Sequence, residues 1–377
     1  MATFPPLSAG TLLSFIISFR GVIDRRHISE VSHMPIADLE IIAKALVSDG
    51  KGILAADETP TTLTKRFDAL KIGSAPDSRR AYREMFFTTP GMAESISGVI
   101  MQDETIHQKN SSGTPLADLL RQQGVIPGIK VDNGAKPLAG SAEETVTEGL
   151  DGLRDRLKDY RHMGARFAKW RAVIRIGEGL PSAACIRANA HALARYAALC
   201  QEQNLAPIVE PEVLMDGFHT IDRCEEVTSN VLHAVFDALF DQRVSLEGML
   251  LKPNMIIAAK QCQQQSPVEE VARATLRCLQ RHVPPAVPGI VFLSGGQDHL
   301  VSTMHLNAIN QLDGPKPWKL SFSFGRALQD EALHKWQGKH ENLHASQSAF
   351  GHRARCVRAA ALAKYTKAME SGLAVEA

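Results

Sequence analysis

Eight short apolar segments recur along the chain from residue 34 onward, and they restrict the fold more than any other feature of the sequence. Each is a near-continuous run rich in Ile, Val, Leu, Gly and Phe, and a longer, more polar stretch follows it. Such runs indicate strands that are buried on both faces, as in parallel sheets. The eight runs are Gly52–Ala56, Ile96–Met101, Val125–Val131, Arg166–Ile176, Leu205–Val213, Val244–Met255, Gly289–Gly295 and Leu320–Ala327.

The stretches around these runs have helical periodicity. Apolar residues recur at three- and four-residue spacing in Ile36–Val47, and Pro181–Gln203 and Val268–His282 are also typical of helices. Eight strands alternating with helices predict an α/β fold, a (β/α)8 TIM barrel with additional N-terminal and C-terminal helices. An open doubly wound sheet is the alternative, but no GxGxxG motif follows the first run.

The domain organisation follows from the absence of linkers in the sequence. No Pro/Ser-rich or low-complexity tract divides the body of the chain. We therefore expect a single TIM-barrel domain over residues 34–377, with a helical C-terminal tail from about residue 330. The Ala-rich segment Ala349–Met369 is predicted to be the main helix of this tail.

Residues 1–33 precede this domain and contain the apolar stretch Leu12–Phe19. That stretch is too short to span a bilayer, which takes ~20 apolar residues, and no basic residue precedes it as in a secretory signal. Three arginines leave a transit peptide as an alternative, although two acidic residues count against it. We expect Met34 to be the native start, and residues 1–33 to be disordered or not part of the native chain.

The composition excludes several classes of partner. The 377 residues carry a formal net charge of +1, so no charge bias points to nucleic acid or a membrane surface. The six cysteines form no CxxC pair, which is typical of free thiols in a reducing compartment such as the cytoplasm. The 14 histidines form no HxH pair and no Cys/His cluster, and the sequence is predicted to hold no metal site.

Polar side chains collect where the eight runs end. In a TIM barrel the carboxyl ends of the strands carry the active site, whereas the strand interiors are apolar. A single charged residue there usually only leaves the sheet for solvent, but this does not explain lysines between apolar neighbours, as in GIKVD and LLKPN. In chain order the ends are Asp57, Gln102 with Glu104, Lys130 with Asp132, Lys169 with Arg171, Glu210 with Glu212, Lys252, Ser294, and Ser323 with Arg326.

Lys252 stands in the middle of the apolar segment Gly248–Ala259. A buried ammonium costs several kcal/mol unless it is paired or neutralised. Poor solvation and a neighbouring cation lower a lysine pKa, and a shift from ~10.4 to ~7 requires about 5 kcal/mol. A neutral amine attacks a carbonyl, and the resulting iminium draws electrons from the adjacent carbon–carbon bond while carboxylates move protons. These residues predict Schiff-base chemistry at Lys252.

The last two strand ends are suited to phosphate. Ser294–Gly296 follows the seventh run, and Ser323–Arg326 ends the eighth. Loops seven and eight of many barrels bind phosphate through backbone N–H groups and hydroxyls, and Arg326 offers a bidentate guanidinium. The two glycines alone would be typical of an ordinary turn. Three further basic residues are candidates for a second anion: Lys130, Arg171 and Arg66.

Seven strings in the chain together resemble class I fructose-1,6-bisphosphate aldolase: GKGILAADE, GIKVD, FAKWR, IVEPE, LLKPNM, FLSGGQ and SFGRALQ. They occur in the family's order, and the similarity runs from about Pro35 to Gln337 and weakens beyond. The resemblance implies a lyase that reversibly cleaves fructose 1,6-bisphosphate to dihydroxyacetone phosphate and glyceraldehyde 3-phosphate, in glycolysis and gluconeogenesis. It also implies that no metal or other cofactor is needed, because the iminium replaces a Lewis acid.

The resemblance also implies roles for individual residues. Lys252 corresponds to the Schiff-base lysine, Glu210 to the main general acid and base, and Lys169 to the neighbour that polarises the substrate. Asp57 corresponds to the group that assists at the hydroxyl of the cleaved bond, and Glu212 to the group that supports the lysines. The implied substrate-binding residues are Ser294, Gly295 and Gly296, Ser323 and Arg326 on the ketone side, Lys130 and Arg171 near the other phosphate, and Arg66.

Two departures from the family concern the substrate: the first affects contacts to the distal phosphate, and the second leaves the preferred substrate open. Thr59–Thr62 replaces a small Ser/Gly-rich string with a loop stiffened by Pro60. The chain ends in Ala377 without the terminal tyrosine of the animal enzymes, and its last tyrosine is Tyr365, in a helix-like stretch. The sequence therefore does not separate a preference for fructose 1,6-bisphosphate from one for fructose 1-phosphate.

Two other functions remain as alternatives, a scaffolding protein that keeps the barrel without turnover and a related Schiff-base barrel that acts on another phosphosugar. The expected partner is a small phosphosugar substrate, with neither nucleic acid nor membrane, and the expected location is cytoplasmic. A homo-oligomer, a tetramer by resemblance, is expected.

Overall fold

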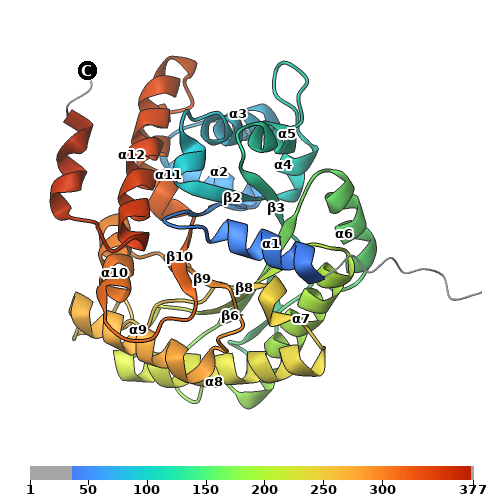
Figure 1. Ribbon diagram of the computed structural model, residues 1–377, viewed down its shortest axis with the longest axis vertical. Helices are drawn as coiled ribbons and strands as arrows, with labels where there is room; N and C mark the ends of the chain where they lie inside the picture. Colours follow the sequence, from blue (N-terminus) through green and yellow to red (C-terminus); the bar gives the residue numbers. More distant parts are fainter. Residues whose placement is uncertain (1–35, 375–377) are drawn as a thin grey trace, which may run out of the picture. The chain divides into compact units, whose positions relative to one another are not determined.

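Eight parallel strands close into a barrel in the order β1-β10-β9-β8-β7-β6-β3-β2. Helices surround the barrel in Figure 1. The structure is a computed structural model and describes residues 36–374. The barrel strands are β1 (Gly52–Ala56), β2 (Ile96–Met101), β3 (Ile126–Lys130), β6 (Phe167–Ile174), β7 (Ala206–Val213), β8 (Leu250–Leu251), β9 (Gly289–Phe292) and β10 (Lys319–Phe324). The predicted (β/α)8 TIM barrel is thereby confirmed, and the open doubly wound sheet is excluded.

The sixth run, Val244–Met255, forms a strand (β8) that is much shorter than the sequence predicts. Only Leu250–Leu251 is extended and paired, because η2 (Leu246–Gly248) forms a 3-10 turn before it. The amide of Lys252 still donates to Val209 O at 2.8 Å, but Pro253 has no N–H with which to continue the ladder. Lys252 therefore stands at the point where β8 leaves the sheet.

Helices cover the outside of the barrel and one of its ends. They are α1 (Ile36–Leu46), α2 (Pro60–Ala69), α3 (Pro76–Phe87), α4 (Asp103–His107), α5 (Leu116–Gln122), α6 (Leu153–His162), α7 (Ala183–Glu202), α8 (Ile221–Asp241), α9 (Val268–His282), α10 (His299–Gln311), α11 (Arg326–Trp336) and α12 (Leu343–Ala361). Further 3-10 turns are η1 (Met92–Glu94), η3 (His340–Asn342) and η4 (Lys367–Ala374), and β4 (Ala135–Pro137) pairs with β5 (Thr145–Thr147) in a hairpin.

Two local predictions are corrected by these helices. Thr59–Thr62 is not a loop: the Thr59 hydroxyl accepts from Thr62 N and caps α2, where Pro60 takes the first helical position that tolerates proline. The tail helix ends at Ala361 and not at Met369. Ala363 there adopts a left-handed φ of 59° and Lys364 N donates to Ala359 O, as in a Schellman cap. Tyr365 lies beyond the helix end.

Helix α1 lies across the amino ends of the strands (Figure 1). Its last residue, Leu46, and the adjoining Val47 belong to an apolar cluster with inward side chains of the barrel, among them Phe167, Leu250 and Val291. Burial of this cluster closes one end of the barrel, so that only the carboxyl ends of the strands are open to a substrate.

Glycines on β2 and β3 leave room for this apolar cluster at the amino end of the barrel. A β-carbon at Gly128 would lie 2.2 Å from the Phe167 ring, and one at Gly98 would lie 2.6 Å from Leu46. Glycine is therefore required on β2 and β3 by close approach and not by backbone conformation.

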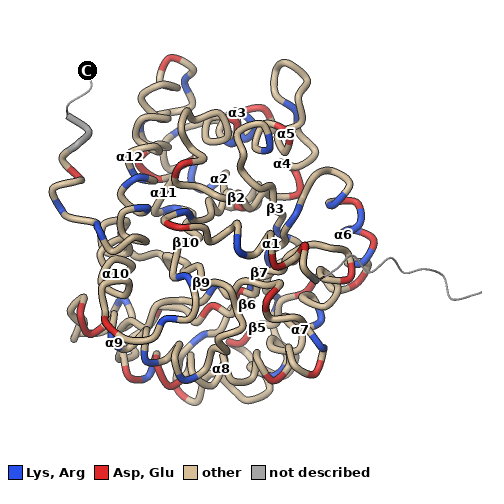
Figure 2. Tube along the Cα trace, viewed as in Figure 1, with Lys and Arg blue, Asp and Glu red and all other residues tan. Residues whose placement is uncertain are grey.

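Charges of both signs alternate along the outer helices, for example α6 and α8 (Figure 2). None of the described helices is both long enough and apolar enough to cross a membrane. The described residues belong to one compact unit. The expectation for residues 1–33 lies outside the described residues.

Replacement of Gly128 by alanine is expected to lower the free energy of unfolding by roughly 1–3 kcal/mol, because the added methyl overpacks the barrel interior against Phe167. Urea denaturation would measure the change. Gly73→Ala is the matched control, since no heavy atom lies within 4 Å of its β-carbon position. Equal stability of the two variants would contradict the packing argument, and Phe167→Leu should restore part of the loss in Gly128→Ala.

Candidate active site

A cavity of about 430 Å³ opens at the carboxyl ends of the barrel strands. Every residue to which the sequence analysis gives a catalytic or substrate-binding role lines it: Asp57, Arg66, Lys130, Lys169, Arg171, Glu210, Glu212, Lys252, Ser294, Gly295, Gly296, Ser323 and Arg326. Seven of the eight strand ends thus converge as the barrel predicts.

The end of β2 is the exception. Gln102 accepts from Glu104 N and caps α4, while Glu104 forms an ion pair with Arg79 at 2.5 Å. Neither side chain lines the cavity. The turn into a helix directly after β2 directs these polar groups outward.

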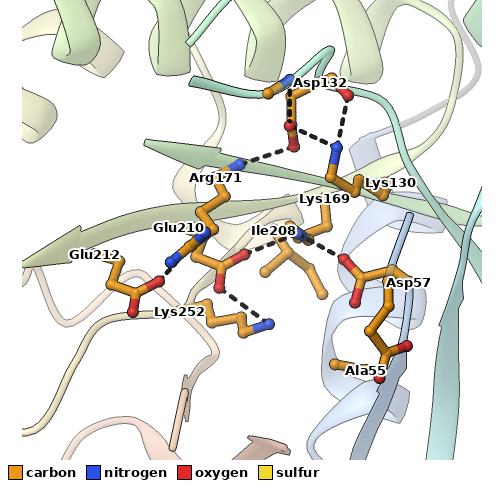
Figure 3. Close-up of polar contacts among 12 residues, drawn as sticks. Ala55, Asp57, Lys130, Asp132, Lys169, Arg171, Ile208, Glu210, Glu212 and Lys252 are labelled. Carbon is orange, nitrogen blue, oxygen red and sulfur yellow. Dashed lines mark hydrogen bonds and ion pairs between the residues drawn. The ribbon is translucent and has the colours of Figure 1, made fainter. Parts of the chain in front are cut away.

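A chain of alternating charges lies at the centre of the cavity (Figure 3). Lys169 Nζ is 2.7 Å from Asp57 Oδ2 and 3.2 Å from Glu210 Oε2, and the other oxygen of Glu210 is 3.1 Å from Lys252 Nζ. Lys169, Glu210 and Lys252 are each only 3% exposed. Glu210 therefore bridges the two buried amines, which makes it the group best placed to exchange protons with Lys252.

The strand register produces this chain. Lys130 on β3 pairs with Lys169 on β6, and Arg171 on β6 pairs with Glu210 on β7. Residues two apart on a strand share a face, so Lys169 and Arg171 both point to the same side as their partners. A slip of one residue would turn all of them away from the cavity.

The charge states of Lys169 and Asp57 follow from this pairing. Burial alone disfavours the ammonium of Lys169, but the charges of Asp57 and Glu210 outweigh burial and raise its pKa above the ordinary value. Burial likewise disfavours the carboxylate of Asp57, but the charges of Lys169 and Lys252 outweigh it and lower the pKa. Near neutral pH, and without a substrate, Lys169 is therefore a cation and Asp57 an anion.

A second group of charges surrounds the central chain. Lys130 Nζ lies 2.6 Å from Asp132 Oδ1, and the other oxygen of Asp132 accepts from Arg171 N at 3.2 Å. The Arg171 guanidinium donates to Glu212. The backbone carbonyl of Arg171 accepts from the Thr147 hydroxyl of the β4–β5 hairpin at 2.8 Å. The hairpin thus holds the end of β6 in place.

The loop after β9 and the end of β10 together offer groups that can bind a ligand. The hydroxyl of Ser323 is buried and has no hydrogen-bond partner among residues 36–374. Gly295 and Gly296 have φ values of 60° and 82°, a conformation that favours glycine. Helix α11 begins at Arg326, so its positive end also lies at this part of the cavity. The arrangement fits an anion.

Arg66 lines the cavity, but other groups already occupy its donors. It forms ion pairs with Glu58 and with Asp330 at 2.8 Å, and donates to Gln329 at 3.1 Å and Tyr82 at 3.2 Å. Its charge is therefore balanced within the protein. A substrate contact by Arg66 stays a prediction.

The sequence analysis did not identify Lys260 and Asp216, which also line the cavity. Lys260 Nζ lies 3.1 Å from Asp216 Oδ1. Lys260 follows Lys252 by eight residues and lies in the loop after β8. A basic residue on the carboxyl side of a strand could have indicated that it belongs to the site. The sequence analysis considered only residues directly at the strand ends and therefore missed Lys260.

One described group outside the cavity has metal-binding side chains, namely His352, Cys356 and Glu370. Arg353 donates to both oxygens of Glu370, at 2.7 and 2.9 Å. The carboxylate is thus already neutralised by a buried cation, which disfavours a metal ion at the same place.

Comparisons with known proteins agree with this geometry. The family model "Fructose-bisphosphate aldolase class-I" matches residues 38–377. The "Probable fructose-bisphosphate aldolase class 1" of Xanthomonas campestris pv. campestris is 57% identical over 303 residues, 80% of this chain and 90% of that protein. The cytosolic fructose-bisphosphate aldolase 6 of Arabidopsis thaliana is 53% identical over 328 residues, 86% of this chain and 91% of that protein.

A solved structure is also similar to this chain. It is the fructose-bisphosphate aldolase from Plasmodium falciparum in complex with TRAP and a small-molecule inhibitor, with a TM-score of 0.86 and 47% sequence identity. The match covers 88% of this chain and 96% of that chain.

Replacement of Lys169 by methionine is expected to destabilise the protein most near neutral pH. Removal of one partner from a buried ion pair costs roughly 3–5 kcal/mol. Since the pKa of Asp57 is lowered in the folded state, its contribution is full above the unfolded value of ~3.9 and is lost as the pH falls through the folded value. The raised pKa of Lys169 maintains its contribution at least up to ~10.4. Urea unfolding between neutral pH and about pH 3 would test this profile.

The matched control for this variant is Arg175→Met. Arg175 pairs with Glu143 at 2.7 Å, but both side chains are more than half exposed. Such pairs contribute about 0–1 kcal/mol. If Lys169→Met lost no more stability than this control, or lost the same amount at every pH, the central chain would not have the assigned energetics.

Proposed function

The chain belongs to the class I fructose-bisphosphate aldolase family, and we propose that Lys252 is its Schiff-base lysine and Glu210 its main general acid and base. It is a metal-independent lyase of glycolysis, and its reaction is the reversible cleavage of fructose 1,6-bisphosphate to dihydroxyacetone phosphate and glyceraldehyde 3-phosphate. The contact of 3.1 Å between Lys252 Nζ and Glu210 Oε1 carries the assignment.

Formation of the Schiff base needs a base and then an acid at the same place. As Lys252 attacks the ketone carbonyl, its nitrogen must lose protons, and the hydroxyl of the resulting carbinolamine must gain one to leave as water. Glu210 is within reach of the nitrogen and is held by Lys169 on its other oxygen. One carboxyl group therefore serves both transfers.

Cleavage then uses the iminium as an electron sink. The bond between the third and fourth carbons breaks, its electrons form an enamine on Lys252, and the proton of the fourth-carbon hydroxyl moves to a carboxylate. We assign Asp57 as the group that assists at this hydroxyl. Lys169 remains protonated between Asp57 and Glu210, where its charge stabilises the oxygen that becomes negative.

The rim of the cavity binds the phosphates. Ser294, Gly295 and Gly296, Ser323 and Arg326 receive the phosphate on the ketone side, with the unpartnered Ser323 hydroxyl as the supporting observation. Lys130 and Arg171 lie at the other phosphate. Glu212, to which the resemblance gives support of the lysines, pairs with Arg171 instead and holds it in position. Arg66 is assigned a supporting contact there.

The remaining assignments concern the native protein as a whole. We propose a single aldolase domain over residues 34–377 and a cytoplasmic location, supported by relatives that are named cytosolic. All six cysteines are free, as in a reducing compartment. We also propose a homotetramer, supported by the large exposed side chains of Ile41, Phe218 and Phe240. Light scattering of the purified protein would test the oligomeric state.

Borohydride reduction in the presence of dihydroxyacetone phosphate should attach substrate mass to Lys252. Lys252→Met should abolish both the labelling and the cleavage, and Lys252→Arg should do the same because arginine stays protonated. Mass spectrometry of peptides locates the label, and a steady-state assay measures cleavage. Turnover on a panel of ketose monophosphates and bisphosphates would separate this substrate from another phosphosugar.

The matched control is Lys319→Met, which removes an exposed lysine that pairs with Asp49 on the surface. It should label and turn over like the wild type. Labelling at a lysine other than Lys252, or cleavage that survives Lys252→Met, would exclude the proposed chemistry.

Replacement of Ser323 by alanine should separate binding from stability. The variant removes a buried hydroxyl that has no partner in the described part of the chain, so the free energy of unfolding should stay equal or rise. The KM for fructose 1,6-bisphosphate should increase roughly tenfold. This corresponds to about 1.4 kcal/mol, the free energy lost with one hydrogen bond to a charged group. An unchanged KM would remove Ser323 from the phosphate site.

A further inference from the structure

Two cationic side chains meet over the turn formed by Gly295 and Gly296. A β-carbon at Gly296 would lie 2.8 Å from Arg326 Nη2 and 3.3 Å from Lys260 Nζ. The guanidinium from the start of α11 and the ammonium from the loop after β8 thus flank the same point. Like charges brought together at a cavity rim require a counter-charge.

The backbone around Lys260 is fixed by a second loop. Lys260 N donates to Met215 O at 2.8 Å, and Gln261 N donates to Gly217 O at 3.1 Å. Gly217 N in turn donates to the Gln261 side chain at 2.7 Å. Reciprocal hydrogen bonds of this kind hold Lys260 at the cavity rather than in solvent.

Asp216 on this second loop is the partner of Lys260, at 3.1 Å. The pair is half exposed, with side-chain exposures of 40% for Lys260 and 61% for Asp216, so it contributes about 0–1 kcal/mol to stability. An interaction this weak can be exchanged for a stronger anion. The ion pair with Asp216 therefore keeps the Lys260 ammonium near the Gly295–Gly296 turn and leaves it able to bind another anion.

The charge of a phosphate monoester explains why a second cation is useful. Such a group carries ≈ −1.5 to −2 charge at pH 7, and Arg326 alone leaves about one negative charge unmatched. The positive end of α11 adds only about half a charge. Lys260 is the nearest described ammonium at the Gly296 position.

We propose that Lys260 is a second cationic ligand, beside Arg326, of the phosphate on the ketone side of the substrate, and that Asp216 competes with this phosphate for Lys260. The inference rests on the proposed function, because that function places a phosphate at the Ser294–Gly296 turn. Asp216 then tunes affinity: it orients Lys260 in the free protein, and it weakens phosphate binding by partly neutralising the ammonium.

Calorimetric titration with a hexitol 1,6-bisphosphate tests the proposal, because this ligand has both phosphates but no carbonyl with which to form a Schiff base. Lys260→Met should raise the Kd roughly fivefold, which corresponds to about 1 kcal/mol. Asp216→Asn should lower the Kd, since the ammonium is released for the ligand. The steepness of the salt dependence of the Kd should decrease in Lys260→Met.

The pair Lys319 and Asp49, 2.7 Å apart on the surface, supplies matched controls. Lys319→Met and Asp49→Asn should leave the Kd unchanged. A Kd for Lys260→Met within about twofold of the wild type, or a higher Kd for Asp216→Asn, would overturn the inference.

Failure of the proposed function has a different signature. It appears as the absence of borohydride labelling at Lys252 in the wild-type protein, whereas the titration does not involve Lys252 chemistry. A wild-type protein that binds no bisphosphate at all would overturn both proposals.

Discussion

Two lysines and two carboxylates buried side by side at the barrel mouth are the constraint on which the rest of the structure depends. Each of these charges alone would cost several kcal/mol in an apolar environment. Their order, Asp57, Lys169, Glu210 and Lys252, places opposite charges next to one another at 2.7 to 3.2 Å. The same order leaves Glu210 shared between a charged amine and the proposed nucleophile. Pairing that makes burial tolerable therefore also creates a proton donor and acceptor beside Lys252.

The barrel makes this order possible because its register is fixed from the opposite end. Helix α1 and the ring of Phe167 fill the amino end of the barrel, where glycines on β2 and β3 leave room for them. Once this end is filled, the pairing of β3 with β6 and of β6 with β7 sets which side chains face the mouth. The apolar cluster and the charged site thus lie at opposite ends of the same set of strands.

The rim differs from the centre in how it uses charge. Central pairs are almost completely buried, and their strength is not screened by solvent. Pairs at the rim, such as Lys260 with Asp216, are half exposed and easily exchanged. Rigid charges suit the bond-breaking step, whereas exchangeable ones suit a phosphate that must enter and leave.

The sequence by itself determined the barrel and most of its site, because the eight apolar runs impose parallel strands and parallel strands bring their carboxyl ends together. It determined the family as well, through seven strings in order. Tertiary structure decided what spacing along the chain does not encode. Arg66 is balanced by Glu58 and by Asp330, which is 264 residues later, and Glu104 turns outward to Arg79. Lys260 reaches the Gly295–Gly296 turn because its loop is hydrogen-bonded to residues 215–217. Which charges are matched within the protein, and which remain for a ligand, depends on distances between segments far apart in the chain.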